Sequence, residues 1–267
     1  IRVDKKTFNL IVTLNTAEKM FQVRLAAEND KIRADKEALH LIVVQDTWRK
    51  MLQVRLAAEN DDIRADKETL NLIAAQDTWL KMLLVRLVAE NVDIRADKKV
   101  FDIIAMLDTA EKMREVKLAV ENDKIRADKE AFSLIATLDT AEKMREVRLA
   151  AENDDIRADK EILNLIAMLD TAEKMREVRL AAMNDDIRTD KEALNLIAML
   201  DTWEKMHEVR WAMTNDKIRA KCKANSQLLR TGKLSEITHF IKQCMLPAVG
   251  EVEIQKKMKP RCGTGGK

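Results

Sequence analysis

A 31-residue unit recurs along most of this chain and constrains its fold more than any other feature of the sequence. It is clearest from Asp128 to Ala158, which reads DKEAFSLIATLDTAEKMREVRLAAENDDIRA. No insertion or deletion separates the copies, whose first residues are Asp4, Asp35, Asp66, Asp97, Asp128, Asp159 and Asp190. A fixed period of roughly 20–50 residues is typical of repeat arrays, in which each unit is stable only against its neighbours. We therefore expect an array of stacked units.

Each unit carries the apolar spacing of two helices. The shorter helix is predicted from Asp159 to Leu169, with Asp159 as its N-cap. The longer helix is predicted to open with Asp170 as an acidic N-cap and Glu173 close behind, as in a capping box. We expect buried stripes at Leu163, Ile166 and Ala167 on the shorter helix and at Met175, Val178 and Ala182 on the longer one, with Glu173, Lys174, Arg176, Glu177 and Arg179 facing solvent.

The turns between these helices must form without the usual turn residues, because residues 1–231 contain neither Gly nor Pro. An Asn recurs where each longer helix should end, and Asn tolerates the left-handed conformation better than most residues. These candidates are Asn29, Asn60, Asn91, Asn122, Asn153, Asn184 and Asn215. The connector that follows carries one apolar anchor, such as Ile156. The predicted fold is all-α, a right-handed α-solenoid of two-helix repeats.

The chain is predicted to divide into three parts. Residues 1–220 form seven regular repeats, residues 221–251 a diverged C-terminal capping repeat, and residues 252–267 a basic tail that is flexible or docks on a partner. The sequence begins at Ile1 inside the repeat pattern, so we expect a preceding segment, with any targeting peptide, to be missing from it. A coiled coil is excluded because 31 is not a multiple of seven, and a globular bundle because every unit repeats the same helix faces.

Composition argues against several classes of function. The net charge is only +2, so the chain is not a strongly basic nucleic-acid binder by composition, and no apolar run is long enough to span a membrane. Three cysteines, Cys222, Cys244 and Cys262, follow no metal spacing and are predicted to be reduced structural thiols. We find no phosphate loop, nucleophile elbow or zinc-protease pattern. We therefore expect no enzyme activity, metal or cofactor.

A polar position interrupts the apolar pattern of each shorter helix. It is occupied by Asn9, His40, Asn71, Asp102, Ser133, Asn164 and Asn195, and by Ser226 in the diverged unit. Stacking would align these residues in one row, beside a second row formed by the Asp that opens each next helix. Two such rows, one pair per repeat, can address successive bases of single-stranded RNA. The alternative is that the first row is only the polar strip that any helix needs.

The unit resembles a pentatricopeptide repeat of the short, 31-residue type. The segments Phe8-Asn9-Leu10-Ile11, Leu70-Asn71-Leu72-Ile73 and Leu163-Asn164-Leu165-Ile166 resemble the start of that family's first helix. The connector resembles the run that closes its repeats, and residues 226–237 resemble its turn and second helix. The resemblance covers about residues 3–251, although tetratricopeptide-type hairpins are not far away.

In that family the fifth and last residues of a repeat together select one base. The resemblance therefore implies the pairs Asn9–Asp35, His40–Asp66, Asn71–Asp97, Asp102–Asp128, Ser133–Asp159 and Asn164–Asp190. Asn–Asp pairs imply uracil and the Ser–Asp pair implies guanine, whereas the His–Asp and Asp–Asp pairs fall outside the usual code. Three tryptophans, Trp48, Trp79 and Trp203, could stack on bases, but we expect them to pack between helices.

These features lead to a functional prediction with one alternative. We expect a non-enzymatic protein that binds U-rich single-stranded RNA at about one base per repeat. The resemblance implies a mitochondrion or chloroplast, with a role in organellar RNA metabolism or an organellar ribosome. The alternative is a protein-binding scaffold or architectural subunit of a large assembly.

Overall fold

The computed structural model describes residues 5–245, apart from the side chains of residues 6 and 7. The predicted tail, Cys262 and residues 246–251 of the predicted capping repeat lie outside this range. All regular secondary structure in the described part is helical, and it contains no strand. The chain forms two compact units, Ile1–Arg148 and Leu149–Lys267, and the division falls within α14 (Ala141–Ala151). No helix in the described range is long and apolar enough to cross a membrane.

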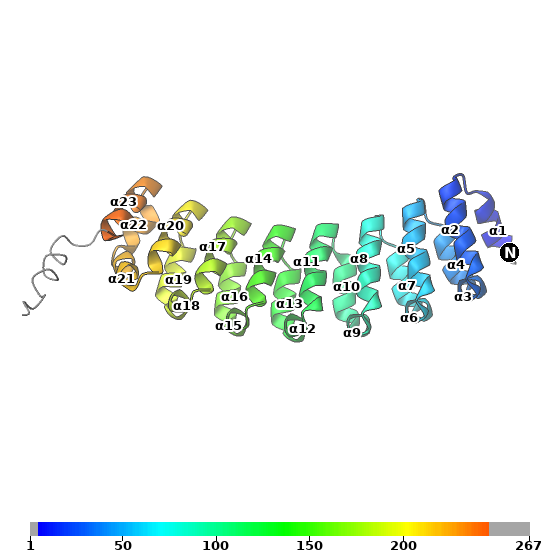
Figure 1. Ribbon diagram of the computed structural model, residues 1–267, viewed down its shortest axis with the longest axis horizontal. Helices are drawn as coiled ribbons and strands as arrows, with labels where there is room; N and C mark the ends of the chain where they lie inside the picture. The colour runs from blue at the N-terminus through cyan, green and yellow to red at the C-terminus, as the bar shows by residue number, and fades with distance from the viewer. Residues whose placement is uncertain (1–4, 246–267) are drawn as a thin grey trace, which may run out of the picture. The chain divides into compact units, whose positions relative to one another are not determined.

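Three kinds of helix alternate in the first unit (Figure 1). First helices are eight or nine residues long, second helices eleven or twelve, and connector helices five. The first helices are α1 (Lys5–Val12), α4 (Lys36–Val43), α7 (Lys67–Ala74), α10 (Lys98–Met106) and α13 (Lys129–Ala136). The second helices are α2 (Ala17–Glu28), α5 (Trp48–Glu59), α8 (Trp79–Glu90), α11 (Ala110–Glu121) and α14. The connector helices are α3 (Asp30–Ala34), α6 (Asp61–Ala65), α9 (Val92–Ala96) and α12 (Asp123–Ala127).

The second unit continues the same order. Its first helices are α16 (Lys160–Ala167) and α19 (Lys191–Ala198), its second helices are α17 (Ala172–Ala182) and α20 (Trp203–Met213), and its connector helices are α15 (Asp154–Ala158) and α18 (Asp185–Thr189). It ends with α21 (Asp216–Ala224), α22 (Ser226–Thr231) and α23 (Leu234–Met245).

The first helices begin as predicted, on an Asp N-cap. Asp159 has a non-helical backbone, and its carboxylate accepts a hydrogen bond from the Ile162 N–H at 3.2 Å. That bond satisfies one of the free N–H groups that every helix start exposes. The prediction of an Asp N-cap on the shorter helix is therefore confirmed.

The N-cap of the second helices was predicted one residue too early. Thr171, rather than Asp170, has the extended backbone of an N-cap, and its hydroxyl accepts from the Lys174 N–H at 3.4 Å. Asp170 instead forms an ion pair with the Lys174 side chain at 3.0 Å. Both Asp and Thr are good N-caps, so the Asp-Thr pair does not by itself decide which residue takes the role.

The recurring Asn residues have a different role from the one predicted. Asn60 is extended, with φ −76° and ψ 117°, and no residue other than Gly has positive φ in the described range. Its side-chain oxygen accepts hydrogen bonds from the N–H groups of Asp62 and Ile63, at 3.0 and 3.2 Å. Asn60 is thus the N-cap of connector helix α6, and the connector that the sequence suggested is a third helix. The left-handed prediction is wrong.

An arginine closes the other side of each connector. The Arg64 guanidinium donates to the backbone carbonyl of Ala58 at 2.8 Å, which satisfies a carbonyl at the end of second helix α5. The connector's apolar residue, Ile63, has no exposed surface. The expected apolar anchor is confirmed. Together, one Asn, one Arg and one Ile make a joint that needs no Gly.

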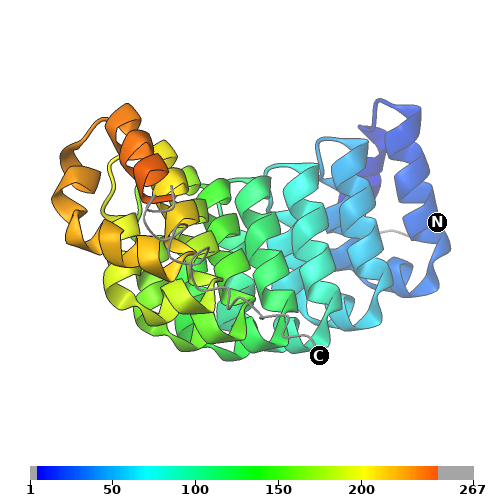
Figure 2. The same ribbon diagram turned by 60° about the vertical axis from the view of Figure 1, so that its left-hand side comes forward.

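Helices of the same kind pack against one another within each compact unit. In the first unit α2 contacts α5, α5 contacts α8, and α8 contacts α11, so these helices lie side by side (Figure 1 and Figure 2). First helices α1, α4 and α7 also follow one another in contact. In the second unit α17 contacts α20, and α20 contacts α23. The predicted stripe on the longer helix, Met175, Val178 and Ala182, is completely buried.

Charged side chains also link neighbouring second helices. Arg148 on α14 pairs with Glu115 on α11 at 3.0 Å, and Arg210 on α20 pairs with Glu177 on α17 at 2.7 Å. Glu177 was predicted to face solvent, but only 5% of it is exposed. The error arises because Glu177 is covered by a partner far along the chain, which the spacing within one helix does not reveal.

The diverged C-terminal copy changes the helix pattern at its first residue. Lys221 replaces the Asp that caps first helices α4, α7, α10, α13, α16 and α19, and without that acceptor α21 runs on from Asp216 to Ala224. Gly232 then separates α22 from α23. The Gly232 N–H donates a hydrogen bond to the Leu228 carbonyl oxygen at 2.8 Å. A side chain at this position would place its Cβ 2.5 Å from that oxygen, which is too close, so the turn requires Gly.

Candidate functional site

The predicted polar row lies on the first helices of both units. In the first unit Asn9, Asn71, Asp102 and Ser133 are exposed, and His40 is partly exposed. In the second unit Asn164 and Asn195 are exposed, and Ser226 is partly exposed. Because first helices α1, α4 and α7 contact one another in order, they present their row residues at matching points.

Each polar residue projects from a well-anchored piece of helix. On α7, Leu70 and Ile73 have no exposed surface, and Asn71 lies between them on the outer side. The amide nitrogen of Asn71 lies 3.5 Å from the Glu37 carboxylate, at the limit of a hydrogen bond. The row therefore consists of polar side chains whose helices are anchored by buried neighbours and whose polar atoms are accessible.

The predicted Asp row is used mainly for structure. Each member is partly buried and accepts a hydrogen bond from a backbone N–H three residues later, as the N-cap of a first helix. These caps are Asp35, Asp66, Asp97, Asp128, Asp159 and Asp190. Asp66 uses its second oxygen as well, accepting from the Thr69 hydroxyl at 2.8 Å.

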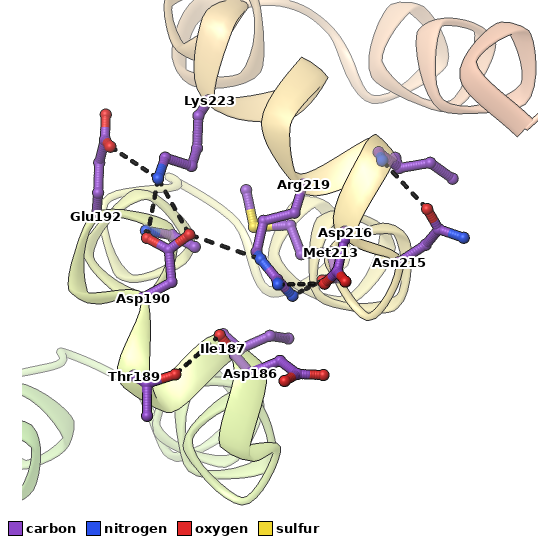
Figure 3. Close-up of polar contacts among 12 residues, drawn as sticks. Asp186, Ile187, Thr189, Asp190, Glu192, Met213, Asn215, Asp216, Arg219 and Lys223 are labelled. Carbon is purple, nitrogen blue, oxygen red and sulfur yellow. Dashed lines mark hydrogen bonds and ion pairs between the residues drawn. The ribbon is translucent and has the colours of Figure 1, made fainter.

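Lysines from the next copy cover several of these carboxylates. Lys67 pairs with Asp35, and Lys191 pairs with Asp159. At the C-terminal end, Lys223 lies 3.0 Å from both oxygens of Asp190 and 2.9 Å from Glu192, with Arg219 3.6 Å from the same Asp (Figure 3). The Asp residues therefore hold the helix starts and join neighbouring copies. Sequence reasoning missed these lysines, although a Lys recurs directly after the Asp of each interior copy.

Lysines and backbone N–H groups hold the pKa values of Asp35 and Asp159 in this row below the ordinary value. The Lys191 ammonium holds the pKa of Asp159 below its ordinary value, with help from the Ile162 N–H and against the opposing effect of burial. For Asp35, burial alone would raise the pKa, but hydrogen bonds from Lys67 and from the Ala38 N–H together lower it. These carboxylates accept hydrogen bonds and do not donate them.

Two of the three singled-out tryptophans share one cation. Trp48 and Trp79 are 40% and 37% exposed, and the Arg49 guanidinium lies 5.6 and 5.4 Å from their ring centres. Trp203 is 45% exposed. The indoles are thus only partly packed between helices, in contrast to the prediction.

The three histidines have different surroundings. His40 belongs to the polar row, His207 lies 3.4 Å from Glu177, and His239 lies 2.8 Å from Gln243. Between residues 5 and 245, no three His, Cys, Asp or Glu side chains converge as a metal site would require.

Comparisons with protein-family models, with curated proteins and with solved structures found no match. The polar row, the Asp–Lys links and the exposed tryptophans are therefore the observations from which a function can be inferred.

Proposed function

We propose that this chain is a right-handed α-solenoid of 31-residue repeats that binds single-stranded RNA along its first helices, without catalysing a reaction. The observation that carries this proposal is the polar row. The same position is polar and solvent-accessible in every first helix, whereas the residues directly before and after it are Phe, Leu or Ile in all seven regular copies. The resemblance to pentatricopeptide repeats supports a spacing of one base per repeat.

In this proposal the Asn side chains make the base contacts. An Asn amide can donate and accept at once, so Asn71 or Asn164 can bond both kinds of group on the edge of a uracil. The Asp side chains act indirectly, because their oxygens already cap a helix and pair with lysine. They hold the first helices in place, and with them the position of each Asn.

The test is binding of a fluorescein-labelled U-rich 12-mer by anisotropy, at low and at physiological salt. Each lost base contact costs about 1–3 kcal/mol, so replacing both Asn71 and Asn164 by Ala should weaken binding at least tenfold. The control is Asn15→Ala, a change at an exposed Asn outside the row. Circular dichroism would confirm that the helices are intact.

No binding of any single strand at low salt would refute the proposal, because counterion release favours even non-specific binding under those conditions. Equal binding by the double variant and the native chain would refute the assignment of the row.

A protein-binding scaffold, as an architectural subunit of a large assembly, is the second candidate. It is favoured by the pairing of the lysines beside the row: Lys67 and Lys191 each neutralise an Asp of their own chain, which leaves less positive charge for phosphates. The failure of RNA binding at low salt would leave this candidate. For either function the resemblance implies a mitochondrion or chloroplast, which microscopy of the tagged full-length gene product would test.

A further inference from the structure

The second helices α2, α5 and α8 differ from α11, α14 and α17 on one surface. In α11, α14 and α17 the pair after the buried Met is Arg-Glu, as at Arg114 and Glu115. In α2, α5 and α8 that pair is Phe-Gln, Leu-Gln and Leu-Leu. The helix starts change too, because Ala-Glu at α11 is replaced by Trp-Arg at α5 and Trp-Leu at α8. Because α11, α14 and α17 are nearly identical, they serve as a reference for the other three. After the Met, α2, α5 and α8 carry apolar or uncharged residues where these reference helices carry Arg and Glu.

These substitutions create an exposed apolar patch, which we define as Phe21, Trp48, Trp79 and Leu80. The exposed fractions of these side chains are 54%, 40%, 37% and 37%. Burying large apolar side chains is favourable, so a patch of this kind on consecutive helices marks an interaction surface.

A groove opens within the patch between α2 and α5. It has a volume of about 490 Å³ and is lined by Ala17, Glu18, Phe21, Gln22 and Trp48. The matching groove between α11 and α14 has about 170 Å³, and its lining is Glu111, Arg114, Glu115, Ala141, Glu142 and Arg145. The same place in the fold is therefore wide and aromatic between α2 and α5 and narrow and charged between α11 and α14.

The charges around the patch indicate what it binds. Arg49 lies over both indoles, and none of the ion pairs found in the described part of the chain involves it. The neighbouring Lys50 and Lys81 are held by Asp46 and Asp77, each at 3.1 Å. One available cation in an apolar surface fits a carboxylate flanked by large apolar side chains. RNA is disfavoured, because a nucleic-acid site needs several free cations along the phosphate backbone and this patch offers only Arg49.

The dimensions of the patch match a helix. Packed helices lie about 8–10 Å apart, so the axes of α2 and α8 are separated by about 20 Å. A helix of about 14 residues spans that distance at 1.5 Å per residue. Such a helix would present apolar residues at i, i+3, i+4 and i+7 on one face.

We propose that α2, α5 and α8 form a docking surface for an acidic amphipathic helix of a partner protein. Its large apolar residues occupy the groove between Phe21 and Trp48 and cover Trp79, and one of its carboxylates pairs with Arg49. This surface lies on the second helices and is separate from the polar row on the first helices.

The test uses variants copied from the chain's own later repeats. The patch variant combines Phe21→Arg, Trp48→Ala, Trp79→Ala and Leu80→Glu, and every introduced residue occurs at the same place in α11 or α14. Arg49→Glu changes charge alone, at an exposed position, and keeps the test valid if the patch variant unfolds.

The probe is a displayed library of 16-residue amphipathic helices, with a fixed leucine face and flanks randomised among Glu, Lys, Ser and Gln. Selection on the full chain should enrich peptides with Glu flanks. A selected peptide should bind the patch variant at least tenfold more weakly, which corresponds to about 1.4 kcal/mol. Selection on the Arg49→Glu chain should favour Lys flanks instead.

Several outcomes would overturn the proposal. The selection could enrich no peptide, or enrich peptides with acidic and basic flanks equally, and the patch variant could retain full affinity for a selected peptide. Concentration-dependent dimers that the patch variant abolishes would also overturn it, because a second copy of the chain would then be the occupant. Loss of U-rich RNA binding by the patch variant with no effect on peptide binding would likewise overturn it.

Discussion

Replacing the Asn residues that cap the connector helices is the sharpest test of the fold. We consider the triple variant Asn60→Ala, Asn91→Ala and Asn122→Ala, all in the first compact unit. Each native side-chain oxygen accepts two backbone N–H bonds, at 3.0–3.3 Å. Loss of an N-cap costs about 1 kcal/mol, and the three connectors share none of these bonds. The triple variant should therefore lose about 3 kcal/mol of unfolding free energy.

The choice of replacement separates the two possible roles of Asn. If these residues had left-handed backbones, Gly would stabilise the chain and Asp would not help. As N-caps with negative φ, they should accept Asp with little loss, because a carboxylate keeps the acceptor and suits the positive end of the helix. Gly should cost a few tenths of a kcal/mol per site.

The assay is urea unfolding followed by circular dichroism at 222 nm, with Asn15→Ala as the control. Unchanged denaturant dependence would show that the same surface is exposed in every variant. A triple Gly variant more stable than the native chain would refute the cap assignment. So would a triple Ala variant within about 0.5 kcal/mol of native, since the loss of three caps exceeds that difference.

Three further predictions follow from burial and charge. Met113→Ala should destabilise the chain by about 2–5 kcal/mol in urea unfolding, because this side chain is completely buried. Met20→Ala, at a side chain that is 52% exposed, should cost under about 1 kcal/mol, and equal losses would contradict the packing described. The pKa of Asp159 is lowered in the folded state, so its contribution to stability is present above its unfolded pKa and is lost as pH falls through the folded value. Asp159→Asn should therefore flatten the decline in unfolding free energy below about pH 4. An unchanged decline would count against the lysine link. Burial raises the pKa of the Cys222 thiol to about 12, so iodoacetamide at pH 8 should leave this thiol unmodified until the chain is unfolded. Peptide mapping by mass spectrometry would show this, and rapid labelling of the folded chain would contradict the burial of Cys222.

Local signals were sufficient to predict the first and second helices. The apolar spacing identified both, and the buried stripe at Met175, Val178 and Ala182 is confirmed. The Asp N-cap of the first helices was also predictable, because Asp directly precedes the apolar stripe. The cap of the second helices was misplaced by one residue because Asp170 and Thr171 are both good acceptors, and the choice between them depends on backbone conformation.

Features that depend on two distant residues or on very short segments could not be read in this way. A connector helix of five residues is too short for any periodicity to reveal, and Asn serves equally as a helix start or a left-handed stop. The Lys191–Asp159 link and the burial of Glu177 depend on how one copy sits on the next. For the candidate site, the sequence identified the residues of both rows, but the use of the Asp row as caps required the structure.

The glycine-free joint has a consequence for how such a gene changes over time. Because each junction between Asp35 and Asp190 reads Ala-Asp or Thr-Asp with the same Asn, Ile and Arg before it, recombination between two of these copies restores a complete joint. Deleting residues 97–127, for example, would place Asp128 directly after Ala96, the same two residue types that meet at the native junction. The number of units can therefore rise or fall by unequal crossing-over, in steps of one whole unit, without a new turn having to evolve.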